Sequence, residues 1–245
     1  MGLFVKTKCG GVLIDHKWVL TAAHCQPGFL GSLVVIVGEY DLTGDFENLK
    51  PVAKPVKRMI VHRNYKPDTF ENDIALLELE SAFEVQPHVI PICLPEADDT
   101  DDYVGLVAHV AGWGKLSYGK FANHLDVIFR FDHIYFFLGG PVPSILQVVK
   151  LPIIPNNQCQ KMFQISGHHK IIRNTFICAG YTDGGKDSCE GDSGGPLMVQ
   201  KDGRWTLIGT VSHGIKCAEP NLPGVYMRTS TYMPWISSIL RRHYD

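Results

Sequence analysis

The sequence predicts an all-β fold, because short apolar runs of strand length alternate with turn residues along most of its 245 residues. Clusters of Gly, Pro, Asn and Asp separate the runs, and totals of 24 Gly and 15 Pro suit a chain with many tight turns. This pattern is typical of β-sandwiches and β-barrels. The clearest runs are 11–14, 33–37, 74–79 and 205–211.

One helix is predicted, at the end of the chain. Thr231 or Ser230 can cap it, and Pro234 suits a first helical turn, where the missing N–H has no partner to lose. The apolar residues that follow share one helical face, so we expect the helix to dock on the β domain through them. They are Trp235, Ile236, Ile239 and Leu240.

Composition excludes several classes of protein. Hydrophobic residues make up 45% and charged residues 20%, which favours a folded domain over a disordered chain. The net charge is −2 and no block of Lys or Arg occurs, so nothing indicates binding to nucleic acid or to a membrane surface. No apolar run approaches the roughly 18 residues of a membrane-spanning helix, so no membrane segment is predicted.

Seven cysteines lie apart in the sequence and form no C-x-x-C pair, which argues against a zinc site of four thiolates. They favour disulfides in an oxidising compartment, and we therefore expect an extracellular protein. Because residues 1–8 are too short for a signal peptide, we also expect that an N-terminal part is missing.

The motif Gly-Asp-Ser-Gly-Gly-Pro at 191–196 is the sharpest chemical signal. Its glycines allow a tight turn that exposes Ser193 as a nucleophile, and the N–H groups of Gly191 and Ser193 can form an oxyanion hole. A Gly-rich surface turn is the alternative interpretation of this motif taken alone.

Two further motifs supply a base and an acid. His24 ends Thr-Ala-Ala-His before Cys25, and Asp73 precedes the apolar run 74–79. Buried beside the histidine, Asp73 would fix the ring tautomer and stabilise the imidazolium. Each residue alone has a simpler interpretation, as a surface histidine or as an acid at a strand end.

The three motifs, in the order His24, Asp73, Ser193, resemble the chymotrypsin-fold (S1) serine proteases of trypsin-like type. The resemblance runs from Cys9 to the last helix, apart from 120–139. It implies two antiparallel six-stranded barrels, the first truncated at its N-terminus, with the site between them. It further implies an endopeptidase that needs no cofactor or metal; the acids of the loop 39–47, where some relatives bind calcium, are expected to be solvated.

The resemblance also implies a substrate pocket. Asp187, six residues before Ser193, matches the family's acid at the pocket base, which selects Lys or Arg. Gly214 and Gly224 match the pocket walls, and Ser212 matches the residue that hydrogen-bonds the triad acid. The alternative for Asp187 is a solvated loop charge, and a preference for Phe over Arg esters would overturn its role.

Cysteine pairing follows from the same likeness: Cys9 with Cys25, Cys159 with Cys178, and Cys189 with Cys217. The seventh, Cys93, matches the cysteine that tethers the protease to an upstream pro-region in multidomain relatives, with a buried free thiol as the alternative.

A narrower likeness concerns the pocket rim. His213 stands where most trypsin-like enzymes have Trp, and Glu190 is expected to favour basic neighbours on the substrate. With 167–170 and 186–190, His213 makes the chain similar to the arthropod filzig and Stubble-type proteases. The exposed loop at 168–169 holds two histidines, for which no metal is predicted.

Two departures from the family pattern matter. No Ile-Val-Gly-Gly-like segment precedes Cys9, so the amine that family members bury against Asp192 is missing, and we expect a zymogen-like or inactive product. The second departure is 120–139, an apolar insertion whose flanks can be encoded by splice signals. It is interpreted as a retained intron or gene-prediction artefact, with a genuine exosite loop as the alternative.

Two functions of other classes stay open. A catalytically silent protease homologue would act as a binding or regulatory module. A disulfide-rich structural protein of the matrix would leave the register of the three motifs unexplained.

Overall fold

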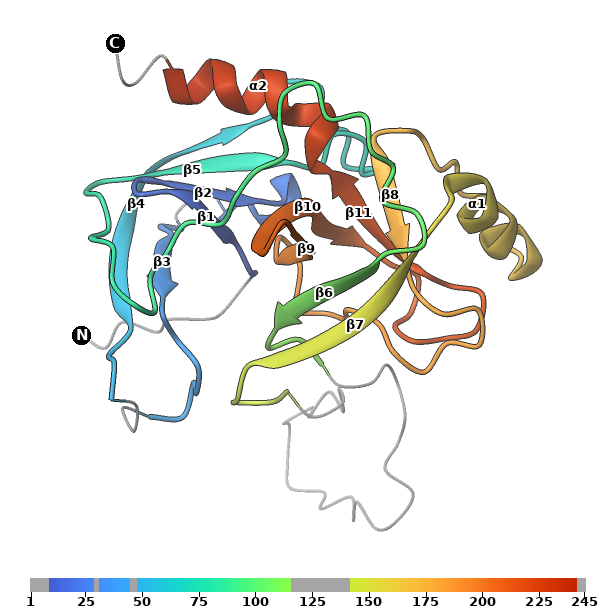
Figure 1. Cartoon of the computed structure of the whole chain (residues 1–245), viewed down its shortest axis with the longest axis horizontal. Helices are drawn as coiled ribbons and strands as arrows, with labels where there is room; N and C mark the ends of the chain where they lie inside the picture. Colours follow the sequence, from blue (N-terminus) through green and yellow to red (C-terminus); the bar gives the residue numbers. More distant parts are fainter. Residues whose placement is uncertain (1–8, 29–30, 45–47, 116–141, 242–245) are drawn as a thin grey trace, which may run out of the picture.

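The computed structural model describes residues 9–28, 31–44, 48–115 and 142–241, so the expected insertion 120–139 lies outside the described residues. The fold is all-β, as predicted, with two β-sheets side by side and few helices (Figure 1). Neighbouring strands in both sheets are antiparallel.

The first sheet is open and has five strands in the order β1-β2-β5-β4-β3. The resemblance implied a six-stranded barrel truncated at its N-terminus, and this half-barrel agrees with that expectation. The predicted runs 11–14, 33–37 and 74–79 coincide with three of its strands. The strands are β1 (Val12–Asp15), β2 (Trp18–Thr21), β3 (Val34–Val37), β4 (Val52–Val61) and β5 (Ala75–Leu79).

The second sheet is a closed barrel of six strands in the order β10-β11-β8-β7-β6-β9. Closure removes both edges of this sheet, because its first and last strands pair with each other. The strands are β6 (Val107–Gly112), β7 (Gln147–Ile154), β8 (Phe176–Ala179), β9 (Pro196–Lys201), β10 (Arg204–His213) and β11 (Gly224–Arg228).

Two α-helices accompany the sheets among the described residues. The predicted C-terminal helix is α2 (Thr229–Arg241), but it begins before Ser230, so Pro234 lies inside it rather than in its first turn. Helix α1 (Asn156–Ile165) was not predicted, because its mostly polar sequence hides an apolar face of Cys159, Met162 and Phe163. Neither helix has the length and apolarity of a membrane span, within the described ranges.

One hydrophobic cluster joins the two sheets and fixes their relative position. It contains Leu20 and Leu76 from the first sheet and Leu207 from the second, all fully buried. Ile236 of α2 is 0% exposed in the same cluster, so the predicted apolar stripe does dock the helix. Burying apolar surface stabilises the folded state by roughly 25 cal/mol per Å². This cluster therefore fixes the two sheets against each other, and with them the loops that contain the site residues.

Candidate active site

His24 and Asp73 are brought together by the pairing of β2 with β5. Thr21 is paired with Ala75 in this register, so the residues just after β2 lie beside the residues just before β5. His24, in the 3₁₀ turn Ala23–Cys25, has its Nδ1 2.8 Å from Asp73 Oδ2, and its backbone N–H donates to Oδ1 at 2.9 Å. Asp73 is fully buried, so both oxygens of its carboxylate are held by hydrogen bonds instead of water.

The segment ahead of Asp73 is pinned from two sides. Asn72 adopts a left-handed backbone, with φ of 57°, which Asn tolerates better than most residues. Its side chain donates to Asn64 O at 2.9 Å and accepts from Tyr232 Oη of α2 at 3.1 Å. The C-terminal helix therefore helps to place the acid.

Ser212, at the end of β10, completes a row of hydrogen bonds across the two sheets. Its hydroxyl donates to Asp73 Oδ2 at 2.6 Å, and the side chain is almost fully buried. The family resemblance implied a hydrogen bond from Ser212 to Asp73, and the structure contains this bond.

The Ser193 loop packs against the start of the first sheet. Gly10 N–H donates to Ser193 O at 2.7 Å, and the neighbouring Gly194 has φ of 79°. A Cβ on Gly194 would lie 2.3 Å from Thr21 Oγ1, so only glycine permits this close approach. Ser193 therefore lies beside the segment that carries His24, although no hydrogen bond joins Ser193 Oγ to His24 in the described part of the chain.

Two backbone donors of this loop are unused. Gly191 has φ of 103°, and neither its N–H nor that of Ser193 donates a hydrogen bond to another described residue. Such free N–H groups are available to an oxyanion.

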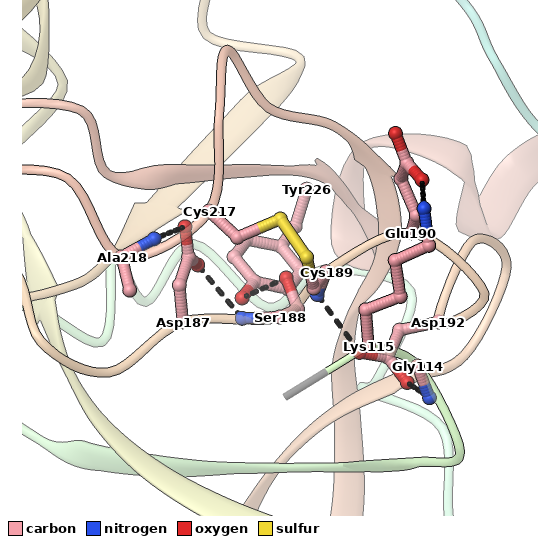
Figure 2. The surroundings of a disulfide bond; sticks show 10 residues. All are labelled: Gly114, Lys115, Asp187, Ser188, Cys189, Glu190, Asp192, Cys217, Ala218 and Tyr226. Atoms are coloured by element: carbon pink, nitrogen blue, oxygen red, sulfur yellow. Dashed lines mark hydrogen bonds and ion pairs between the residues drawn. A yellow bond between two sulfur atoms is a disulfide. The ribbon is translucent and has the colours of Figure 1, made fainter. Parts of the chain in front are cut away.

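Asp192 turns away from these donors into the protein. Its two carboxylate oxygens accept the N–H groups of Gly114 and Cys189, each at 2.8 Å (Figure 2). Burial raises the pKa of Asp192, and the two backbone hydrogen bonds oppose that rise.

Asp187 lies next to the Cys189–Cys217 disulfide (Figure 2). Its oxygens accept from Ser188 N–H at 2.8 Å and from Ala218 N–H at 3.3 Å, and these two donors adjoin the disulfide-bonded Cys189 and Cys217. Burial raises the pKa of Asp187 to about 7, against the lowering effect of the same hydrogen bonds. The alternative interpretation as a solvated loop charge does not suit a carboxyl group held in this way.

The two glycines that the resemblance places at the pocket walls differ in their surroundings. A Cβ on Gly224 would lie 2.8 Å from Asp187 Oδ1, so this glycine leaves room for the carboxylate. Gly214 is exposed, and a Cβ there would meet no atom within 4 Å.

Several features of the rim escaped the sequence analysis. Glu190 forms an ion pair with Lys115, whose backbone N–H also donates to Glu190 O at 2.9 Å (Figure 2). The acid expected to meet basic substrate residues is therefore already partnered within the chain. Phe70, from the loop before β5, lies edge-on to His24 with ring centroids 5.7 Å apart, and nothing in its sequence context indicated this contact.

Three disulfides join the cysteines in the expected pairs, and Cys93 is free and partly exposed. Cys9, His24 and Cys25 lie close enough together to share a metal ion, but the two cysteines are bonded to each other and offer no thiolate.

The Trypsin family model matches residues 1–130 and 133–236. The chain is 56% identical over 98% of its length to Serine protease filzig of Drosophila melanogaster, and 44% identical over 96% to Serine proteinase stubble of the same species. It is 37% identical over 92% of its length to Venom serine protease Bi-VSP of Bombus ignitus.

The chain spans only 13% of the length of filzig and 27% of the length of stubble, but 57% of Bi-VSP. The likeness therefore concerns the protease part of these relatives. With the half-barrel, the closed barrel and the family match in agreement, the chain belongs to the trypsin family of serine proteases.

Proposed function

We propose that the protein is a serine endopeptidase that hydrolyses peptide bonds after Lys or Arg. The observation that carries the proposal is the hydrogen-bonded row of His24, Asp73 and Ser212 beside the Ser193 loop. Asp187, whose pKa is raised by burial, supports the Lys or Arg preference. No cofactor is needed for this chemistry.

In this mechanism Ser193 Oγ attacks the scissile carbonyl while His24 Nε2 takes its proton. Asp73 holds the Nδ1–H tautomer and stabilises the imidazolium that forms. The N–H groups of Gly191 and Ser193 stabilise the oxyanion, and the loss of one such donor lowers kcat by roughly 10²–10³-fold. Collapse breaks the C–N bond and expels the amine, which takes the proton held by His24, and leaves an acyl-enzyme. Water, deprotonated by His24, then attacks the acyl-enzyme, and Ser193 Oγ leaves with that proton.

Specificity would come from Asp187. A Lys or Arg side chain passing Gly214 and Gly224 would reach a carboxyl group whose burial makes its charge costly until a cation arrives. The substrate cation and Asp187 would then form a charge-assisted, partly desolvated ion pair. An aromatic substrate side chain cannot form such a pair and would bind more weakly.

Purified protein of residues 1–245 tests the proposal with a serine-directed fluorophosphonate probe and with Arg and Phe esters, alongside Ser193→Ala. An active endopeptidase should be labelled and should cleave the Arg ester, and Ser193→Ala should abolish both. A zymogen-like product, which the missing Ile-Val-Gly-Gly-like segment predicts, should do neither. Faster cleavage of the Phe ester would overturn the role of Asp187 but not the triad. Labelling of Ser193→Ala at the same rate would overturn the triad itself.

A silent homologue is the second candidate, and two observations favour it. Asp192 has both oxygens on backbone amides rather than on a cation, and Ser193 Oγ makes no hydrogen bond to His24 in the described chain. This form predicts neither labelling nor cleavage, while peptides ending in Arg still bind at Asp187.

We further propose that the protein acts outside the cell and that Cys93 tethers it to an upstream pro-region. Three disulfides suit an oxidising compartment, and Cys93 is a partly exposed free thiol beside a cavity of about 710 Å³. Electrophoresis of the longer protein, cut at the junction, should release the two parts only under reducing conditions. Cys93→Ser should release them without reductant.

The segment 120–139 is proposed to be a retained intron or a gene-prediction artefact, since its flanks can be encoded by splice signals. Sequencing of the transcript decides, because a message that always contains these codons would favour a genuine loop.

A further inference from the structure

His213 lies beside the triad at a point where β10 is irregular. Val211 pairs with Tyr226 and His213 pairs with Val225, so Ser212 is an extra residue in this strand. Such a bulge re-aims side chains that would otherwise point to opposite faces. As a result the neighbouring Ser212 Oγ and His213 Nδ1 lie 2.9 Å apart.

Aromatic rings hold the His213 side chain in place. Its ring is stacked on Phe70, with centroids 4.8 Å apart and planes at 21°, and it meets Phe176 edge-on at 5.7 Å. Phe70 also contacts His24 edge-on, so one phenyl ring supports both imidazoles. The orientation of His213 is therefore fixed by packing and not only by its hydrogen bond.

The hydrogen-bond distances assign the protons. Ser212 has one hydroxyl proton, and its 2.6 Å bond to a carboxylate is shorter and stronger than a bond to a neutral ring nitrogen. The proton therefore points at Asp73, and the Ser212 oxygen is left to accept. His213 must donate through Nδ1–H, which leaves its buried Nε2 as a lone pair without a partner among the described residues.

His213 is a steady donor because it stays neutral. Burial, with the positive charges of Lys170 and His24, lowers the pKa of His213 to about 3. The single ring proton is thus available for the Ser212 bond at every pH at which a trypsin-type enzyme works.

We propose that His213 is a positioning residue that acts on the triad through Ser212. By donating to the Ser212 oxygen it stops the hydroxyl from rotating and keeps that group directed at Asp73 Oδ2, the same oxygen that lies 2.8 Å from His24 Nδ1. Connected hydrogen bonds of this kind polarise and strengthen one another in a buried site. The proposal rests on the proposed function, because it assigns His213 a part in that same reaction.

Three variants separate the hydrogen bond from the packing. His213→Phe keeps a stacking ring without a donor, His213→Asn places an amide N–H near the former Nδ1, and His213→Gln places it near the former Nε2. With a small Arg ester, we expect His213→Phe and His213→Gln to lower kcat about 3- to 10-fold at unchanged KM, the size of one neutral hydrogen bond. His213→Asn should recover most of the loss.

Nuclear magnetic resonance gives a readout that needs no turnover. Nitrogen-15 spectra of the wild type should show Nδ1 of His213 protonated and Nε2 unprotonated from pH 5 to pH 8. The low-field proton between His24 and Asp73 should move in His213→Phe and return toward its position in His213→Asn.

The outcomes distinguish this inference from the function on which it rests. A wild type that neither cleaves esters nor reacts with the fluorophosphonate probe would refute the proposed activity. The nitrogen-15 spectra would still test whether His213 Nδ1–H donates to Ser212. A protonated Nε2, or equal kcat values in the wild type and His213→Phe, would overturn the positioning role.

Discussion

The two halves of the molecule hold their site residues by different means. The half with the closed barrel carries Asp187, Ser193 and Ser212 on loops and strand ends around β9 and β10, and it contains two of the three disulfides. The open five-stranded sheet carries His24 and Asp73 with one disulfide. The proposed nucleophile and the proposed specificity acid thus belong to the half without free edges.

A small set of polar contacts joins the two halves near the site. Ser212 Oγ donates to Asp73, and Gly10 N–H donates to Ser193 O. Tyr232 of α2 donates to Asn72, and Arg173 pairs with Glu71. The barrel can therefore keep its pocket while the alignment of the base with the nucleophile changes. Substitutions on the open sheet should act mainly on kcat, and substitutions around the pocket mainly on KM.

The largest effect is expected when Asp73 is changed. Asp73→Asn keeps the shape but holds the wrong His24 tautomer, and we expect kcat to fall about 10⁴-fold. Ser212→Ala removes only one hydrogen bond to the same carboxylate and should lower kcat no more than about tenfold. Burst and steady-state kinetics with an Arg ester measure both, and equal losses would contradict this ranking.

The difference between the halves also shows what sequence can predict. Asp73, His24 and Ser193 stand in local motifs, so their proximity was predictable from a likeness in spacing. Strands such as β5 were predictable because their apolar runs are bounded by turn residues. Helix α1 was missed because Cys159, Met162 and Phe163 become an apolar face only when the Cys159–Cys178 disulfide and the barrel give them something to cover.

Contacts between distant loops could not be predicted in the same way. The Lys115 partner of Glu190 lies 75 residues away, and Phe70 reaches His213 from another sheet. The bulge at Ser212 depends on a register shift between β10 and β11, which no single strand encodes. These contacts form only when distant segments pack together. They set the surroundings of Glu190, His213 and Ser212 at the site.

The next effect compares two disulfides. Cys9–Cys25 closes a separation of 16 residues next to His24, and Cys189–Cys217 closes one of 28 residues around Asp187. Removal of either should lower the free energy of unfolding by about 3 kcal/mol, since the loop lengths are similar on a logarithmic scale. The double alanine variant at 9 and 25 should mainly lower kcat, and the variant at 189 and 217 should mainly raise KM for Arg esters.

Urea denaturation and ester kinetics on the two double variants provide the measurement. A rise in KM from the 9 and 25 variant, with kcat unchanged, would contradict the separation of roles between the halves.

A smaller effect should distinguish the two pocket glycines. Gly224→Ala would press its Cβ to within 2.8 Å of Asp187 Oδ1, so the carboxylate has to move, and we expect binding of benzamidine to weaken about 10- to 100-fold. Gly214→Ala meets no atom within 4 Å in the free protein and should leave benzamidine binding within about threefold of the wild type, although a longer substrate side chain feels the added methyl group. Calorimetric titration with benzamidine measures the affinity of both variants, and equal affinities would contradict the predicted difference.

The smallest effect is a pH dependence confined to the barrel half. The pKa of Asp187 is raised to about 7 in the folded protein, above its value in an unfolded chain, so the group favours folding most strongly at low pH and this contribution is lost as pH rises from about 4 to 7. A cation bound at Asp187 favours the ionised carboxylate over the protonated form, because the opposite charge stabilises it. Benzamidine should therefore bind about tenfold more weakly at pH 6 than at pH 8, with release of a proton on binding at pH 6.

Calorimetry in two buffers with different ionisation enthalpies measures the released proton, and Asp187→Asn should abolish both the release and the pH dependence. His24 lies on the other half and is not needed for this binding. The same pH dependence should therefore persist in Asp73→Asn, and its loss there would show that the pocket and the triad are electrostatically coupled rather than held independently by their two halves.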